Sequence, residues 1–161
     1  MTPQELGQRR YEDWQAKNFA HFLKKYEGFD KVARKGSNEK HFTIGHGHYG
    51  PDVKPGQRIT EEEAGILLNK DVRRRIPEIK NLIPKFDSFP IKAQIALFGE
   101  YYRGSLKGSP ETLKHINAGR FSEAAVEFLD NDEYRNRVKL NRPGIGPRMR
   151  TVSYYLNKMA K

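Results

Sequence analysis

The chain of 161 residues contains no cysteine, only one tryptophan and no long apolar run. Without thiols it can form neither disulfides nor thiolate metal sites, so its stability must come from packing, and the redox compartment stays open. A membrane-spanning helix needs about 20 apolar residues in a row, and no apolar run in this chain approaches that length. The N-terminal segment MTPQELGQRRYEDW lacks the apolar core of a signal peptide. We therefore expect no signal peptide and no stable membrane insertion.

Acidic residues are also in the minority, because 30 lysines and arginines face 20 aspartates and glutamates and leave a formal net charge of +10. Such a balance favours attraction to polyanions, namely nucleic acid, anionic lipid headgroups or a bacterial wall, and composition does not choose among them. With 36% hydrophobic residues, the chain is long enough for one domain with a core or for two small lobes that share a helix.

The apolar pattern predicts a chain that is helical at both ends. Residues 5–26 are predicted to be a helix with one apolar stripe, formed by Phe19, Phe22, Leu23 and Tyr26, and Gly28 ends it. Residues 29–58 are rich in glycine and proline and include the β-compatible triplet 41–43. A second helix begins at Thr60, whose hydroxyl and the carboxylate of Glu63 form a capping box.

The remaining helices are predicted from their proline, serine and glycine signals. Pro77 and Pro84 are expected to break or kink the second helix and the segment after it. Further helices are expected to begin at Pro90, Ser109-Pro110, Ser122 and Pro147. The sum is an α+β chain with a small β lobe and a larger helical lobe.

Two features are candidates for chemistry. Glu27 stands where the first helix ends, and from there it could face a cleft as a general acid, although a solvated surface carboxylate is the plainer interpretation. In the run TIGHGH, residues 43–48, the glycines let the backbone approach a ligand closely, and the hydroxyl of Thr43 can orient a water molecule. A tight hairpin without function would also need these glycines.

Together these segments resemble the phage-type lysozymes, or endolysins, of glycoside hydrolase family twenty-four. The family's signature is a helix ending in Glu-Gly, a short loop and Thr-Ile-Gly-x-Gly-His, which matches residues 27–28 and 43–48. The segments GPDVKPGQRITEEEAGILLNKDV, ETLKHINAGRFSEAAVEFL and GIGPR are similar to its later blocks. The resemblance covers roughly residues 19–157, so chance is a poor explanation.

The resemblance implies a lysozyme-like α+β fold in which a small β lobe, about residues 29–58, and a helical lobe, about residues 60–161, flank a cleft. We expect one lysozyme-like domain over residues 19–161, preceded by an N-terminal helical extension over residues 1–18. The implied activity is that of a muramidase, which cleaves the bond between N-acetylmuramic acid and N-acetylglucosamine in bacterial peptidoglycan.

The resemblance also assigns roles to individual residues. Glu27 is the general acid, Thr43 positions the water, and Ser37 occupies the place of a second carboxylate. Substrate contacts are implied at four positions, Tyr49, Tyr101, Thr112 and Glu127, of which Tyr101 could equally belong to the core. A supporting structural role is implied for the pair of His48 and Asp71 and for Arg148.

One departure from the family concerns the second carboxylate. The family usually has an aspartate nine positions after the glutamate and six before the threonine, and these counts reach Gly36 and Ser37 here. Hydrolysis normally needs a second carboxylate, so three routes stay open. Glu27 acts alone while Ser37 and Thr43 hold the water, Asp30 or Glu39 swings in, or a hydroxyl of the substrate attacks, as in lytic transglycosylases.

Other classes of function are represented in the sequence as well. His41, His46, His48 and Asp52 are compatible with zinc, but no third ligand follows at a recognised spacing, so we expect neither a metal nor another cofactor. A non-catalytic module that binds the wall or nucleic acid through its positive charge would explain the missing aspartate, although it would not need Glu27 and Thr43.

The sequence therefore predicts a monomeric phage muramidase that acts on peptidoglycan, with nucleic acid not expected as a partner. The resemblance implies that it stays in the host cytoplasm until a holin releases it to the cell wall, or that it travels with the virion.

Overall fold

A computed structural model describes residues 1–161, with seven α-helices, one 3-10 helix and a three-stranded sheet. The chain divides into two compact units, Met1–Ile76 and Pro77–Lys161, called unit 1 and unit 2 below. The division falls inside a helix. The first helix runs unbroken through residue 18, and the division into an extension over residues 1–18 and one domain over residues 19–161 stays a prediction.

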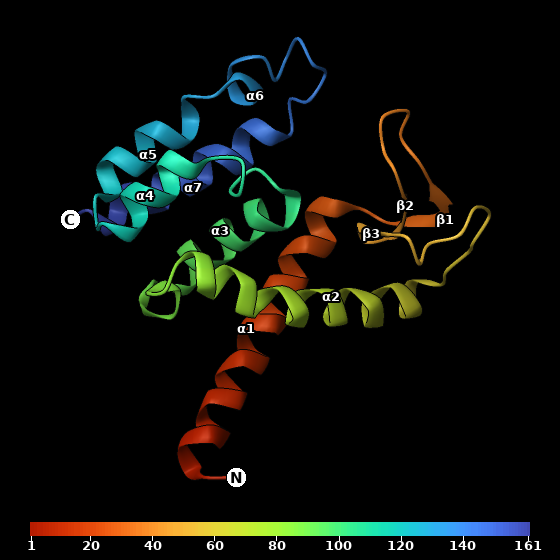
Figure 1. Ribbon diagram of the computed structural model, residues 1–161, viewed down its shortest axis with the longest axis horizontal. Coiled ribbons are helices and arrows are strands. Elements are labelled where there is room, and N and C mark those ends of the chain that lie inside the picture. The colour runs from red at the N-terminus through yellow and green to blue at the C-terminus, as the bar shows by residue number, and fades with distance from the viewer. The chain divides into compact units, whose positions relative to one another are not determined.

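Unit 1 begins with the long helix α1 (Pro3–Glu27), drawn in red in Figure 1. Thr2 caps its start by accepting the amide hydrogen of Glu5 at 3.0 Å. Residues 1–10 are all exposed, and burial begins further along the helix, where Phe19 and Leu23 are 1% and 0% exposed. The helix thus enters the packed part of the molecule only in its second half.

A small antiparallel sheet follows, with the strand order β1 (Asp30–Arg34), β2 (Phe42–Gly45) and β3 (His48–Gly50). It confirms the β lobe predicted for residues 29–58. Its core is a cluster of four buried residues, Ile44, Val53, Ile59 and Ala64. A Cβ atom at Gly45 would lie 3.2 Å from the Cβ of Ala64, so glycine lets β2 lie close to the next helix.

That helix, α2 (Glu61–Leu82), begins as predicted. Thr60 Oγ1 accepts the amide hydrogen of Glu63 at 3.1 Å, and Glu63 Oε1 accepts that of Thr60 at 3.0 Å, which confirms the capping box. Of the break or kink expected at Pro77, the break does not occur, since α2 continues through this proline and ends at Leu82. Pro77 has no amide hydrogen, so the carbonyl of Arg73 loses its usual helical donor there.

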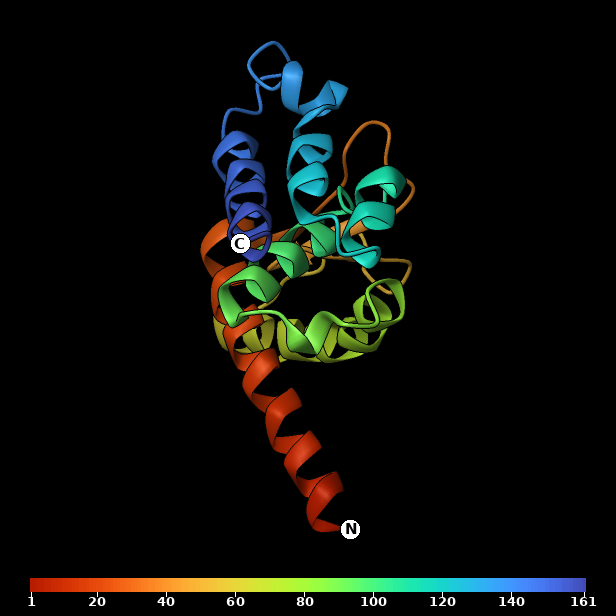
Figure 2. The same ribbon diagram turned by 90° about the vertical axis from the view of Figure 1, so that its left-hand side faces the viewer.

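Unit 2 is helical. After the end of α2 come η1 (Phe86–Ser88), α3 (Ile91–Arg103), α4 (Pro110–Asn117), α5 (Phe121–Leu129), α6 (Asp132–Arg135) and α7 (Ile145–Met159). Helix α5 packs against α4 and α7, and α3 packs against α7; Figure 2 shows α5 and α7 side by side. The largest side chains that this packing buries completely include Phe98, Phe128 and Met149.

The predicted helix starts in unit 2 agree with the structure to within two residues. Ser109 precedes α4 as expected, α3 begins one residue after Pro90, α5 begins one residue before Ser122, and α7 begins two residues before Pro147. The short elements η1 and α6 were not predicted. No helix is both long enough and apolar enough to cross a membrane.

Candidate functional site

The end of α1 places Glu27 at the last helical position, where its side chain is half-buried. Gly28 ends the helix with φ 68° and ψ −159°, a backbone conformation that essentially only glycine adopts. The Glu-Gly pair is therefore a helix stop that turns the chain directly after the carboxylate. This local geometry explains why glycine follows the candidate acid.

His46, in the TIGHGH run, contacts the backbone of this turn. The imidazole Nδ1 of His46 lies 2.6 Å from the carbonyl oxygen of Gly28, and the ring is 8% exposed. Gly45 and Gly47, with φ 67° and φ 83°, turn the backbone on either side of His46. The glycines thus serve a hairpin, as the plainer interpretation held, and this hairpin also contacts the backbone next to Glu27.

Thr43 lies on the central strand of the same sheet, paired with Tyr49 on β3 and with Arg34 on β1. It is 7% exposed, and the neighbouring Ile44 is fully buried in the core of unit 1. Asp30 of β1 pairs with Gly45 of β2. Because Asp30 closely follows Glu27 and Gly45 closely follows Thr43, this pairing connects the segment after Glu27 to the strand that carries Thr43. Thr43 is therefore held rigidly in unit 1, which also contains Glu27.

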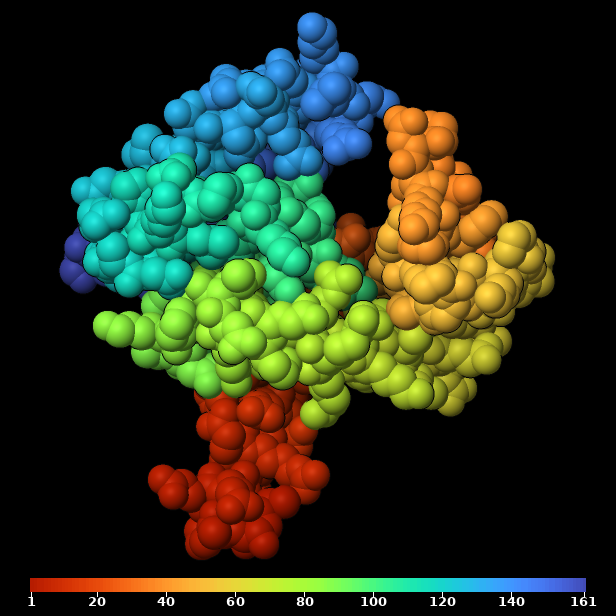
Figure 3. Space-filling view, viewed as in Figure 1, coloured from red at the N-terminus to blue at the C-terminus, as the bar shows by residue number.

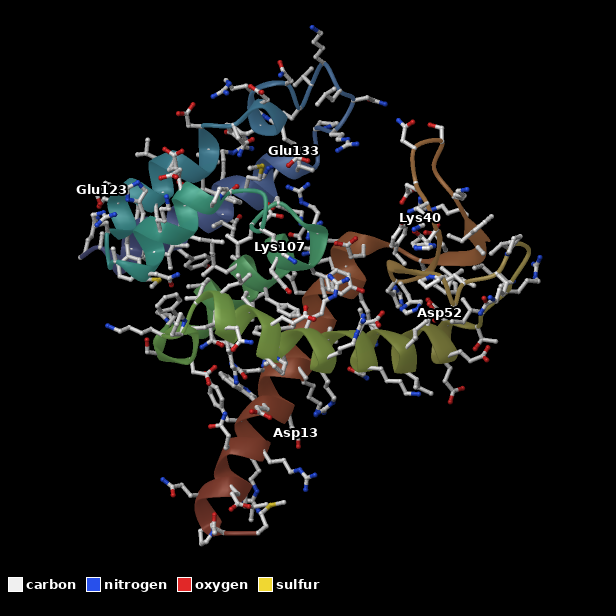
Figure 4. The ribbon with its side chains drawn as sticks, viewed as in Figure 1. Asp13, Lys40, Asp52, Lys107, Glu123 and Glu133 are labelled. Carbon is white, nitrogen blue, oxygen red and sulfur yellow. The ribbon has the colours of Figure 1, made fainter.

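The loop between β1 and β2 carries Ser37, which is exposed. Figure 3 shows this loop, in orange, standing out from the surface. Lys40, which belongs to the loop, is labelled in Figure 4. Glu39 Oε1 accepts the amide hydrogen of Gly36 at 2.8 Å and so closes the turn that contains Ser37. Asp30 Oδ2 accepts from Arg34 Nε at 2.7 Å. Both acids considered as replacements for the missing aspartate therefore already have local partners.

Tyr49 is the one predicted substrate contact that lies in unit 1. It is 41% exposed, its hydroxyl accepts the amide hydrogen of His41 at 3.1 Å, and the two rings meet edge to face at 5.4 Å. An exposed aromatic face held in this way is suited to stacking on a sugar ring.

His48 lies between two carboxylates. Its Nδ1 is 2.7 Å from Asp71 Oδ2, the contact that the resemblance predicts, and its Nε2 is 2.8 Å from Asp52 Oδ2. Asp71 also accepts from Arg74 at 3.2 Å, and Asp52 is labelled in Figure 4. Burial opposes the charge on the ring, but the hydrogen bonds to Asp52 and Asp71 outweigh it and raise the pKa of His48. The bond to His48 in turn lowers the pKa of Asp52.

The histidines considered for zinc thus have separate tasks. His46 contacts a backbone carbonyl, whereas His48 contacts two carboxylates. No group of three or more histidine and acidic side chains is arranged to hold a metal ion.

Of the four predicted residues of unit 2, two are buried and two are half-buried. Tyr101 is 8% exposed and donates its hydroxyl hydrogen to Glu78 at 2.5 Å, which fits its alternative interpretation as a core residue. Thr112 is 1% exposed, and its hydroxyl oxygen is buried without a hydrogen-bond partner. Glu127 is half-buried on α5, and Arg148 donates to the carbonyl of Gly99 at 3.3 Å.

An ion-pair cluster in unit 2 was not predicted. Arg103 donates to the buried Glu100 at 2.7 Å and to Glu133 of α6 at 3.0 Å, and Glu133 is labelled in Figure 4. The bond from Arg103 lowers the pKa of Glu133, although partial burial opposes that shift. The cluster connects α3 to α6 and includes none of the predicted site residues. A cavity of unit 2, about 810 Å³ and lined by Phe89, Phe121 and Lys158 among others, includes none of them either.

Comparison with known proteins decides the family. The profile described as "Phage lysozyme" matches residues 24–145. The chain belongs to this family. The matched segment includes Glu27 and Thr43, while Arg148 lies just beyond it. The predicted family is thereby confirmed.

Two curated relatives of this chain are endolysins. The endolysin of Bacillus phage B103 is 40% identical over 110 residues, covering 66% of this chain and 41% of that protein. The endolysin of Bacillus phage PZA is 34% identical over 113 residues, covering 66% of this chain and 42% of that protein. The chain thus spans about two fifths of the length of these relatives.

Among solved structures, the muramidase domain of SpmX from Asticaccaulis excentricus has a TM-score of 0.59 at 20% identity, covering 89% of this chain and 95% of that chain. This likeness concerns the fold, and it confirms the predicted lysozyme-like α+β class for this chain.

Proposed function

We propose that the chain is a muramidase that hydrolyses the glycosidic bond between N-acetylmuramic acid and N-acetylglucosamine in bacterial peptidoglycan, in the service of phage lysis. The observation that carries the proposal is the arrangement of unit 1. Glu27 ends α1, Thr43 lies on β2, and both the β1–β2 pairing and the His46 to Gly28 hydrogen bond connect the two segments.

In the proposed reaction Glu27 donates a proton to the glycosidic oxygen, and the bond from that oxygen to the anomeric carbon breaks. A water molecule oriented by Thr43, with Ser37 beside it, forms the new bond to that carbon and passes its surplus proton to solvent. Because Asp30 and Glu39 already accept hydrogen bonds from Arg34 and Gly36, the route that relies on Glu27, Thr43 and Ser37 is preferred over one in which another acid swings in.

The same observation favours a second reaction. With one carboxylate available, a hydroxyl of the muramic acid itself can attack the anomeric carbon, which gives the anhydro product of a lytic transglycosylase. Peptidoglycan is the partner in both cases. We propose further that Tyr49 contacts the sugar chain, that the protein acts as a monomer, and that it reaches the wall from the host cytoplasm or on the virion.

The experiment that tests the proposal is mass spectrometry of purified peptidoglycan after digestion by the wild type and by Glu27→Gln. Hydrated reducing-end muramic acid that disappears with Glu27→Gln is the expected result. Anhydro-muramic products would assign the transglycosylase reaction instead. Products that are unchanged in Glu27→Gln would refute the role of Glu27, and a wild type that releases no product while binding the wall would indicate a binding module.

A further inference from the structure

We propose that His46 is a positioning residue for Glu27, acting through a hydrogen bond to the Gly28 carbonyl. The proposal rests on the proposed function, because it takes Glu27 to be the acid of the reaction. His46 occupies the position x of the Thr-Ile-Gly-x-Gly-His run. In this chain its positioning role depends on the hydrogen carried by Nδ1.

The geometry fixes which ring nitrogen carries the hydrogen. A carbonyl oxygen can only accept, so at 2.6 Å Nδ1 of His46 must donate to Gly28. The ring is 8% exposed, so little water can replace the hydrogen bond if the donor is removed. The Nδ1 hydrogen is therefore a fixed feature of the buried ring.

The receiving backbone is one that needs support. Gly28 has φ 68° and ψ −159°, one of the many conformations open to glycine, so holding it there costs conformational entropy and contacts from outside help to fix it. It directly follows Glu27, so a change at Gly28 alters the direction of the last turn of α1. The hydrogen bond from His46 holds the carbonyl of this residue from outside the helix.

The ring itself is held on two sides. The turn conformations of Gly45 and Gly47 direct His46 inward, and the ring of Phe29 lies 5.5 Å from the imidazole. Gly45 is in turn close to Ala64 of α2, so the hairpin cannot easily move. His46 therefore links this hairpin to Gly28, the residue that follows the candidate acid Glu27. A proton-transfer group needs such support, because a displacement of about 1 Å can cost about a hundredfold in rate.

Three substitutions separate the donor from mere packing. His46→Asn places an amide hydrogen where Nδ1 stands, His46→Gln places one nearer the position of Nε2, and His46→Leu fills the space without a donor. His21→Leu, at an exposed histidine of α1, is the matched control. The measurements are kcat and KM on soluble peptidoglycan fragments, with the melting temperature of each variant.

We expect His46→Leu to lower kcat by about tenfold to a hundredfold with little change in KM. We expect His46→Asn and His21→Leu to remain close to wild type, and His46→Gln to lie between His46→Asn and His46→Leu. Equal kcat for His46→Leu and wild type would overturn the proposal. So would equal losses for His46→Leu and His46→Asn at similar melting temperatures, because such losses would reflect packing. If His46→Leu does not fold, the order of His46→Asn above His46→Gln is the test, and its absence overturns the proposal.

A second measurement does not depend on catalysis. The side-chain carboxyl ¹³C resonance of Glu27, assigned by its loss in Glu27→Gln, is followed against pH in each variant. We expect the titration curve to move in His46→Leu and to remain in place in His46→Asn and His21→Leu. Overlapping curves for His46→Leu and wild type would overturn the positioning role. A wild type without any product would refute the proposed function while leaving this readout intact.

Discussion

Glu39 Oε1 lies 2.8 Å from the amide nitrogen of Gly36 and accepts its hydrogen. A Cβ atom at Gly36 would lie 2.4 Å from the same oxygen, so the loop is built around the carboxylate. An acid in the segment between Glu27 and Thr43 is thus used to shape the β1–β2 loop, at the place where the family usually has a catalytic aspartate.

Glu39→Gln should therefore retain most of the lytic activity, because a glutamine oxygen can still accept the Gly36 hydrogen. Glu27→Gln should lose at least about a hundredfold, a typical contribution of general acid catalysis. Turbidity loss of a cell-wall suspension measures both rates. A loss in Glu39→Gln as large as that in Glu27→Gln would instead make Glu39 the second carboxylate.

Ser37 offers a test of the water-holding route. It is exposed, so Ser37→Asp introduces a carboxylate near the family's usual position, whereas a side chain at Gly36 would displace the Glu39 carboxylate. We expect Ser37→Ala to lower kcat by about tenfold through loss of a hydroxyl contact, and Ser37→Asp to restore or exceed the wild-type rate. Rates on soluble fragments provide the comparison. An unaltered rate in Ser37→Ala would remove Ser37 from the mechanism.

The pair of His48 and Asp52 predicts a window of pH in which the fold is most stable. The pKa of His48 is raised above 6.5, so its contribution is complete below pH 6.5 and is lost as pH rises through the raised value. The pKa of Asp52 is lowered below 3.8, so its contribution is complete above pH 3.8 and is lost as pH falls through the lowered value. Both contributions are complete between pH 3.8 and 6.5.

Asp52→Asn should lower the pKa of His48 and destabilise the protein within this window. Because 67% of the Asp52 side chain is exposed, the expected loss is only about 0.2–1 kcal/mol. An NMR titration of His48 and thermal melts across pH measure the two effects. Asp30→Asn, which removes an arginine partner instead, is the control and should leave the pKa of His48 unchanged. A His48 pKa that is the same with and without Asp52 would contradict the account.

Ile44 anchors the strand that carries Thr43. It is fully buried, so Ile44→Val should cost about 0.5–1.5 kcal/mol and Ile44→Ala about 2–5 kcal/mol in the free energy of unfolding. Ile66→Ala, at a 54% exposed position of α2, is the matched control and should cost much less. Urea denaturation measures all three. Equal costs for Ile44→Ala and Ile66→Ala would mean that this small core does not support the sheet.

The features that the sequence predicted well depend on neighbours in the chain. The capping box of Thr60 and Glu63, the stop at Gly28 and the start of α4 after Ser109 each involve residues a few positions apart. Their physical causes are local: a side chain meeting an amide in the capping box, a glycine adopting positive φ at Gly28, and a proline in the first turn of α4.

The features that were missed depend on tertiary structure. His46 and Gly28 are 18 positions apart in the sequence, and no periodic pattern predicts their contact. The only sequence signal for it was the pair of glycines on either side of His46. The cluster of Arg103 with Glu133 spans 30 positions. For Tyr101 the sequence left a substrate contact and a core role open, and only its burial and its bond to Glu78 favour the core role. The continuation of α2 through Pro77 shows that packing can outweigh the cost of a proline.

Pro77 has one more consequence. It stands at the first residue of unit 2, where the helical hydrogen-bond ladder of α2 lacks a rung. Cooperative opening tends to stop where such a ladder is interrupted, so amide hydrogens on the two sides of Pro77 should exchange with solvent at different rates and with different dependence on denaturant. One continuous helix would then report two separate local stabilities, one for the sheet that holds Thr43 and one for the helices that follow.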